Sequence, residues 1–120
     1  MMEKRNKRKL GARVEQQVKE YLMAQGFDIL ELNYRCRQGE IDIIAREQEY
    51  YVFIEVKYRS TLQYGTPQEA VGSAKQKRIC GAAKYYLYCH KLGEFTPVRF
   101  DVAAVMGNTI SYIKNAFELV

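Results

Sequence analysis

The chain has 120 residues, of which 48% are hydrophobic, and a formal net charge of +5. This length supports one compact core. No run approaches the roughly 20 apolar residues of a membrane span, and no apolar run follows the N-terminal charges, so we expect a cytoplasmic protein without a secretory signal or membrane partner. Three cysteines without CxxC spacing argue against a disulfide framework or a zinc site. The basic charge suits an acidic partner such as nucleic acid.

The first ten residues concentrate positive charge, at Lys4, Arg5, Lys7, Arg8 and Lys9. Because like charges at this density disfavour folding, we predict a flexible basic arm over residues 1–10, followed by a single domain over residues 11–120. The arm would lie along nucleic-acid phosphates. The alternative is a tail that only adds solubility.

A helix is predicted from about Gly11 to Gln25, with Gly26 as its stop. Its apolar residues recur at helical spacing, at Val14, Val18, Tyr21 and Leu22. Glu15 shares a face with Val18 and Leu22 and can therefore point toward the sheet. The alternative is an exposed ion pair between Glu15 and Lys19, one turn apart.

A strand over about 27–33 precedes a predicted hairpin. The hairpin strands are Gly39–Ala45 and Tyr51–Lys57, which alternate and are rich in β-branched and aromatic residues. The polar residues between them supply the reversal. We place Gln48 and Glu49 at the tip, which fixes the register of every other pair.

This register separates the charges of the hairpin from most of its apolar residues. It places Asp42 opposite Glu55 and Glu40 opposite Lys57. The other face is apolar, with Val56, Ile54 and Val52 meeting Ile41, Ile43 and Ala45. The hairpin therefore gathers carboxylates and a lysine on one face.

The facing carboxylates of Asp42 and Glu55 require a counter-charge. Two unit charges about 5 Å apart repel by about 3 kcal/mol at an effective dielectric of ~20. Lys57 neutralises one charge, and a Mg²⁺ or Mn²⁺ ion is the expected partner of the remainder. The alternative is an exposed face with weak ion pairs. Ile44 and Phe53 continue the charged face toward the tip and favour a half-buried site instead.

The next helical segment follows a loop. Thr66–Glu69 matches a capping box that opens a short helix ended by Gly72. A second capping pattern, Ser73–Gln76, opens a longer helix that ends at about Lys91. The Gln76 amide would reach the site and orient a water or a phosphate. The alternative is an ordinary helix-start amide. Basic residues flank this position, at Lys75, Lys77 and Arg78.

The C-terminal segments complete the expected fold. His90 lies at the end of the longer helix, where an interaction with the helix C-terminus is favoured over catalysis. Val98–Met106 is predicted as a buried strand, and Gly107–Asn108 turns it into a last strand over Thr109–Ile113. The strand–helix–strand connection makes the fourth strand parallel to the third. We therefore expect an α/β fold with α/β/α layers, a mixed β-sheet and an αβββαβ core, in which Asp101 has a structural role.

Basic and aromatic residues are interleaved near the predicted strand ends, at Arg35, Arg37, Arg59, Tyr34, Tyr58 and Tyr64. The cations would contact phosphates while the tyrosines stack on bases. The alternative for the tyrosines is to cap the core. The predicted nucleic-acid-binding residues are Arg35, Arg37, Arg59, Lys75, Lys77 and Arg78.

Five motifs occur in a specific order. They are Gly39-Glu40-Ile41-Asp42, Glu55-Val56-Lys57 with Arg59, Gly65-Thr66-Pro67, Lys75-Gln76 with Arg78, and Arg99-Phe100-Asp101-Val102. From about Gly11 to Val105, this order resembles the bacterial YraN family of proposed endonucleases. That family is similar to archaeal Holliday-junction resolvases and belongs to the PD-(D/E)xK nuclease group. The chain has Ile41 where many members of the wider group have proline.

The resemblance implies a three-layer α/β/α restriction-endonuclease-like fold and Mg²⁺-dependent or Mn²⁺-dependent hydrolysis of phosphodiester bonds in DNA, including branched or junction DNA. Asp42 and Glu55, together with the Val56 carbonyl, would bind the metal. Lys57 would stabilise the developing charge or position the nucleophile. A symmetric junction has two strands to cut, so a homodimer is the expected assembly.

Two further catalytic candidates are Glu15 and Gln76. A glutamate on the first helix near the metal recurs in these nucleases, which favours the inward position of Glu15. One alternative function is a non-cleaving nucleic-acid-binding module that acts with a DNA-processing partner. Another is a purely structural network of the same acids.

Overall fold

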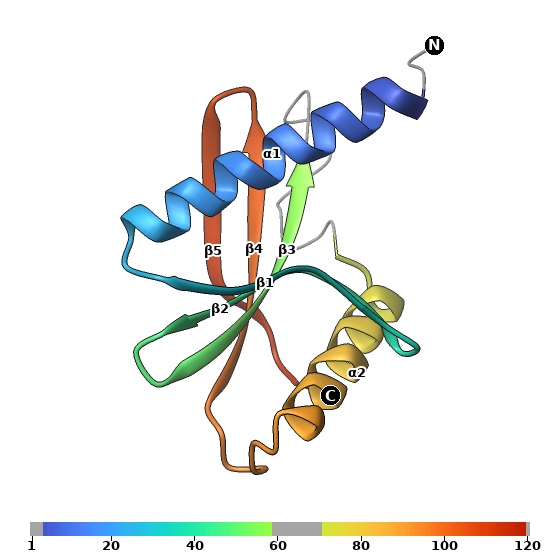
Figure 1. The fold of residues 1–120 in the computed structure, drawn as a ribbon, viewed down its shortest axis with the longest axis vertical. Coiled ribbons are helices and arrows are strands. Elements are labelled where there is room, and N and C mark those ends of the chain that lie inside the picture. Colours follow the sequence, from blue (N-terminus) through green and yellow to red (C-terminus); the bar gives the residue numbers. More distant parts are fainter. Residues whose placement is uncertain (1–3, 59–70, 120) are drawn as a thin grey trace.

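The computed structural model describes residues 4–58 and 71–119, with side chains from Gly11 onward (Figure 1). The predicted order of helices and strands is confirmed over these residues, including the last strand that follows Gly107–Asn108. The elements are α1 (Lys4–Ala24), β1 (Asp28–Cys36), β2 (Gly39–Glu47), β3 (Tyr50–Tyr58), α2 (Ser73–Cys89), β4 (Val98–Met106) and β5 (Thr109–Phe117). No helix in this part of the chain is long and apolar enough to cross a membrane.

The strands form one mixed sheet in the order β1-β2-β3-β4-β5. β3 pairs with β4 in parallel, and the other neighbours are antiparallel. The parallel pair requires a crossover, because a tight turn can join only antiparallel strands. The segment that contains α2 provides this crossover. The predicted α/β class and the parallel third and fourth strands are confirmed.

The two helices cover opposite faces of the sheet (Figure 1). Ile43 and Ile54 are buried in one cluster with Val14, Val18 and Leu22 of α1. Their neighbours Ile44 and Phe53 are buried in a second cluster with Ile79 and Ala83 of α2. Successive side chains of a strand point to opposite faces, so α1 and α2 pack on different sides.

Several predicted element ends are wrong. α1 begins at Lys4 instead of Gly11, so the segment predicted as a flexible arm is helical from Lys4 onward. β1 continues to Cys36 and β5 to Phe117. The N-cap of α2 is Gly72, without a side-chain cap bond, so the capping role predicted for the Ser73–Gln76 pattern is wrong. The capping box predicted at 66–69 lies outside the described residues.

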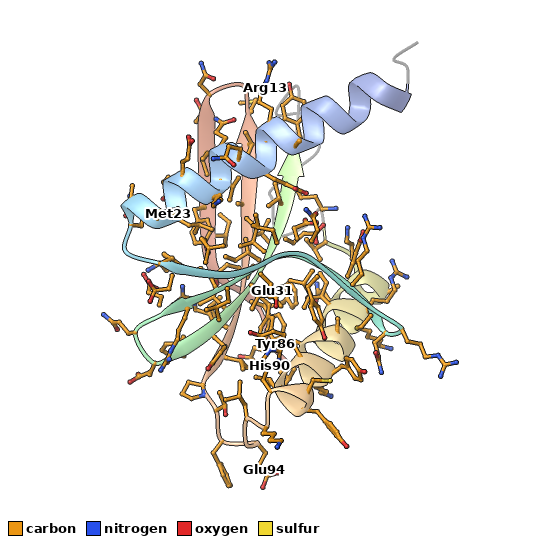
Figure 2. All side chains as sticks on the ribbon, viewed as in Figure 1. Arg13, Met23, Glu31, Tyr86, His90 and Glu94 are labelled. Carbon is orange, nitrogen blue, oxygen red and sulfur yellow. The ribbon has the colours of Figure 1, made fainter. Side chains whose placement is uncertain are left out.

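His90 closes α2, as its position predicts. It is the C-cap residue, and its backbone N–H donates to the Tyr86 carbonyl, while the N–H of the next residue, Lys91, donates to the Tyr88 carbonyl. Its Nδ1 lies 2.9 Å from the Tyr86 carbonyl oxygen, and its ring stacks on the Tyr86 ring at 4.0 Å between centroids (Figure 2). The predicted interaction with the helix C-terminus is confirmed.

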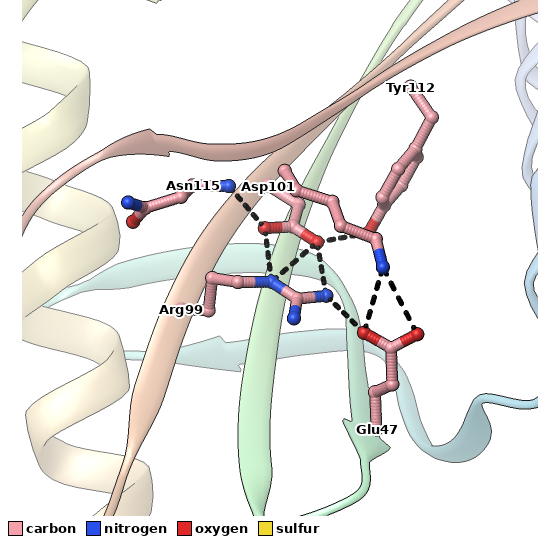
Figure 3. A network of polar contacts seen from close by, with 6 residues as sticks. Glu47, Arg99, Asp101, Tyr112 and Asn115 are labelled. Carbon is pink, nitrogen blue, oxygen red and sulfur yellow. Dashed lines mark hydrogen bonds and ion pairs between the residues drawn. The ribbon is translucent and has the colours of Figure 1, made fainter.

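Asp101 is fully buried within a polar network (Figure 3). Its Oδ1 accepts from Arg99 Nε at 3.0 Å and from the Asn115 backbone N–H at 2.9 Å. Its Oδ2 accepts from Arg99 Nη2 at 3.0 Å and from the Tyr112 hydroxyl. Burial, followed by the charge of Asp101, raises the pKa of Tyr112, so the hydroxyl remains a donor. These bonds give Asp101 the structural role that its position in a buried strand predicts.

Candidate active site

The predicted hairpin register is confirmed toward the tip. The Cα partners include Ile43 with Ile54, Ile44 with Phe53, and Ala45 with Val52. Beyond Ile43, the Asp42 side chain takes part in the pairing, because the Val56 backbone N–H donates to Asp42 Oδ2 at 2.8 Å. In a regular antiparallel sheet, a backbone carbonyl of the neighbouring strand would accept from this N–H. Here the Asp42 carboxylate accepts instead. The site begins where β2 and β3 leave this regular pattern.

Strand alternation also breaks at Asp42. Ile43 packs in the cluster with α1, and regular alternation would place Ile41 there as well. Ile41 instead packs with Ile44 in the cluster with α2. The predicted common face of Ile41, Ile43 and Ala45 is therefore wrong for Ile41. Half-buried Asp42 lies between two residues that belong to different faces of the core.

Glu55 is the most enclosed charge of the site. It is 5% exposed, and its Oε1 lies 3.5 Å from Lys57 Nζ and 2.6 Å from Lys75 Nζ. The sequence predicted the contact with Lys57, which follows two residues later on the same strand. The contact with Lys75 was not predicted, because it depends on how the crossover returns α2 to the sheet. Lys75 was assigned only to the nucleic-acid-binding set.

The carboxyl group of Asp42 is poised to change protonation near neutral pH. Burial, followed by the charge of Glu55, raises its pKa from 3.8 to about 7, against the lowering effects of the Val56 N–H and Lys75. Burial also lowers the pKa of Lys57, although Glu55 opposes this change. A bound cation would offset the repulsion between the two carboxylates.

Glu15 and Gln76 differ in how they relate to the site. Glu15 Oε2 accepts from Asn33 Nδ2 at 3.1 Å, and its charge contributes to the raised pKa of Asp42. Glu15 therefore influences the charge of Asp42 while its side chain bonds Asn33 of β1. The Gln76 amide donates to the Val71 carbonyl at 2.8 Å. This bond matches the alternative role of Gln76 as a helix-start amide.

Glu40 lies apart from the two central carboxylates. Its Oε2 forms an ion pair with Arg35 Nε at 3.2 Å, with both side chains largely exposed. Arg35 is also its Cα partner on β1. Glu40 was predicted to lie opposite Lys57, but it forms its ion pair with Arg35 of the edge strand β1. Glu40 therefore serves as a matched control for Asp42, because it is another acid on the same strand.

The turn between β1 and β2 packs against the beginning of α2. A Cβ on Gly39 would lie 2.9 Å from the Arg78 carbonyl oxygen, and one on Gly81 would lie 3.3 Å from Gln38 Cβ. Arg37 in this turn, like Lys77 and Arg78 of α2, is exposed. The turn therefore brings Arg37 close to Arg78 of α2. Arg59 lies outside the described residues.

Gly39→Ala is expected to lower the free energy of unfolding by about 1–3 kcal/mol. The added methyl would collide with backbone at Arg78, so either the turn or α2 must shift. Thermal unfolding followed by circular dichroism measures the change. Gly11→Ala is the control, because its Cβ meets nothing within 4 Å, and alanine favours a helix. Equal stability of Gly39→Ala and wild type would contradict the tight contact.

A metal ion at this site would be coordinated by few protein ligands. In residues 4–58 and 71–119, no group of three or more His, Cys, Asp or Glu side chains is arranged to hold a metal. Asp42 and Glu55 remain as a carboxylate pair, because the charge of Glu55 acts on Asp42 and Asp42 accepts from the N–H of Val56, the residue after Glu55. Mg²⁺ commonly binds through one or two carboxylates and keeps several waters. The donor set fits such an ion, with the Val56 carbonyl as the predicted additional ligand.

The chain is similar to members of one protein family over most of its length. The model of the uncharacterised protein family UPF0102 matches residues 14–105. A UPF0102 protein of Lachnoclostridium phytofermentans is 51% identical over 113 residues, which cover 94% of this chain and 96% of the relative. A UPF0102 protein of Syntrophus aciditrophicus is 50% identical over 109 residues, which cover 88% of this chain and 85% of the relative. A UPF0102 protein of Clostridioides difficile is 46% identical over 99 residues, which cover 81% of this chain and 86% of the relative.

Proposed function

We propose that this chain is a metal-dependent nuclease that hydrolyses phosphodiester bonds in DNA. The chain belongs to the UPF0102 family, which confirms the predicted YraN resemblance. The observation that carries the proposal is the enclosed Asp42–Glu55 pair with Lys57 beside it. Isolated acids at this burial would be costly without a cation. The mixed sheet between two helices also fits the proposed three-layer restriction-endonuclease-like arrangement.

The residues have distinct proposed roles. Asp42 and Glu55, with the Val56 carbonyl, would hold Mg²⁺ or Mn²⁺. The bound ion would act as a Lewis acid and lower the pKa of a water nucleophile. Lys57 would hold a phosphate oxygen and stabilise the charge that develops on it. Glu15 would add negative charge from the α1 side.

The basic surface formed by the β1–β2 turn and α2 would bind the DNA backbone. Arg37, Lys77 and Arg78 are exposed there, and the net charge of +5 favours a polyanion. One such site cuts one strand, so cleavage of a symmetric junction would require a homodimer. Because the YraN family resembles junction resolvases, branched or junction DNA is the substrate class of first interest.

Incubation with a panel of DNA substrates tests the proposal. The panel contains plasmid, single-stranded, flap and four-way-junction DNA, each with Mg²⁺, Mn²⁺ or a chelator. We expect cleavage only with a metal, and its loss in Lys57→Met, which removes the ammonium group. Cleavage that persists in the chelator, or that Lys57→Met leaves unchanged, would contradict the assigned chemistry.

Metal affinity is expected to fall as the pH drops below about 7. Asp42 must lose its proton to bind a cation, and its pKa is about 7. At pH 6 only about one tenth of the Asp42 carboxyl groups are ionised. The Kd for Mn²⁺ should therefore be roughly tenfold higher than at pH 8. Calorimetry in buffers of different ionisation enthalpy would detect the released proton. An affinity that is constant with pH would exclude Asp42 as a titrating ligand.

A second candidate function is a nucleic-acid-binding module that does not cleave. Lys75 lies 2.6 Å from Glu55 and already supplies a positive charge to the site. That ion pair would stabilise the fold without any metal. DNA retention in a gel shift, combined with no cleavage of any substrate, would favour this candidate.

A further inference from the structure

Two lysines approach the same oxygen of Glu55. Lys75 Nζ lies 2.6 Å from Oε1, and Lys57 Nζ lies 3.5 Å from it. The nearer lysine comes from α2, and not from the hairpin that carries the carboxylates. A divalent cation held by Glu55 would bring a further positive charge to the same carboxylate. Lys75 and the cation would therefore compete for Glu55.

Lys75 is more able to leave than Lys57. The Lys75 side chain is 36% exposed and the Lys57 side chain is 17% exposed. Lys57 follows Glu55 by two residues on β3, which keeps both on one face of the sheet. The stem of Lys75 has four rotatable carbons that can carry the ammonium toward solvent. Arg78, which is exposed, lies three residues later on the same side of this helix and would be the nearest cation in α2.

The position of Lys75 in α2 also favours an anionic partner. Lys75 lies in the first turn of α2, where the helix dipole disfavours a cation. Within α2, all of which the structure describes, this turn contains no acidic residue, and Gly72 provides no side-chain cap. Glu55 supplies the missing negative charge. A phosphate group at the same end of the helix would supply it equally well.

We propose that Lys75 neutralises Glu55 in the metal-free protein and moves to a nucleic-acid phosphate when a divalent cation takes Glu55. The inference rests on the proposed metal-dependent function. It makes cation binding and DNA binding mutually supportive, because a phosphate that holds Lys75 frees Glu55 for the cation. By thermodynamic linkage, the cation would strengthen DNA binding by the same factor. Lys75 is thus a positioning residue that couples the two ligands.

Calorimetric titration of Mn²⁺ into the full chain at pH 8 tests this role. Lys75→Met keeps the aliphatic stem and removes the charge. We expect it to bind Mn²⁺ about tenfold more tightly than wild type, within the usual range of coupling between sites. Lys114→Met is the matched control, because it removes an exposed lysine from a different glutamate, Glu47. Its Mn²⁺ affinity should equal that of wild type.

A hydrolysis-resistant phosphorothioate duplex provides the second probe. It should tighten Mn²⁺ binding by wild type more than by Lys75→Met, because the variant has no lysine to displace. Equal or weaker Mn²⁺ binding by Lys75→Met, beside a wild type that binds, would overturn the role of Lys75 and leave the metal site standing. If neither protein binds Mn²⁺, both this inference and the proposed function are wrong.

Discussion

Asp42→Asn is expected to lose Mn²⁺ binding and yet to be more stable than wild type at pH 8 in the absence of metal. The pKa of Asp42 is raised from 3.8 to about 7 in the folded protein. A raised carboxyl pKa means that ionisation opposes folding. Wild type therefore loses stability as the pH rises from about 4 to about 7, and the loss persists above pH 7. Asparagine removes this loss while its side-chain oxygen can still accept from the Val56 N–H.

The expected gain for Asp42→Asn at pH 8 is about 1–3 kcal/mol, and it should vanish near pH 4. Thermal unfolding at both pH values, with and without Mn²⁺, measures it. Mn²⁺ should raise the Tm of wild type and of Glu40→Gln, but not that of Asp42→Asn. Glu40 provides the control because it is an exposed acid on the same strand. A similar Mn²⁺ stabilisation of all three proteins would place the metal elsewhere.

Arg99→Met is expected to cost about 3–5 kcal/mol of stability, because it leaves Asp101 as a fully buried and uncompensated charge. Arg99 donates to Asp101 through Nε and Nη2, and its Nη2 also lies 2.8 Å from Glu47 Oε1. Its guanidinium also lies over the rings of Phe27 and Tyr50. Chemical denaturation measures the loss as a lower midpoint.

Two variants separate the buried charge from general damage to this region. Lys114→Met also removes a cation from Glu47, but its side chain is 55% exposed, so its cost should stay below about 1 kcal/mol. The double variant Arg99→Met/Asp101→Asn should be more stable than Arg99→Met alone, because it no longer buries an unpaired charge. A cost for Arg99→Met as small as that for Lys114→Met would contradict the structural role of the network.

Local patterns in the sequence predict most of the hairpin and the sheet. Alternation fixes the partners Ile44 with Phe53, and the strand–helix–strand order fixes β4 parallel to β3. The break at Asp42 could not be predicted in this way, because it depends on packing of Ile41 against α2. The sequence thus identifies the acids of the site but not the local bend that brings Asp42 to the Val56 N–H.

Contacts between distant elements explain the remaining differences. The Lys75–Glu55 ion pair depends on the path of the crossover between β3 and α2, which residue spacing does not encode. The network around Asp101 likewise joins Arg99 on β4 to Tyr112 on β5 and Glu47 on β2. The start of the first helix was also predicted too late, since α1 begins at Lys4 and not at Gly11.

Cleavage by wild type and Asp42→Asn, assayed side by side, tests the central claim most directly. Both proteins are incubated with Mn²⁺ or Mg²⁺ and the DNA substrate that wild type cuts best, with Glu40→Gln as the control. The proposed site predicts cleavage by wild type and Glu40→Gln, and a loss of about 10²–10³-fold for folded Asp42→Asn, comparable to the loss of a major electrostatic contribution. Equal cleavage by wild type and Asp42→Asn would show that the carboxylate pair is not the active site.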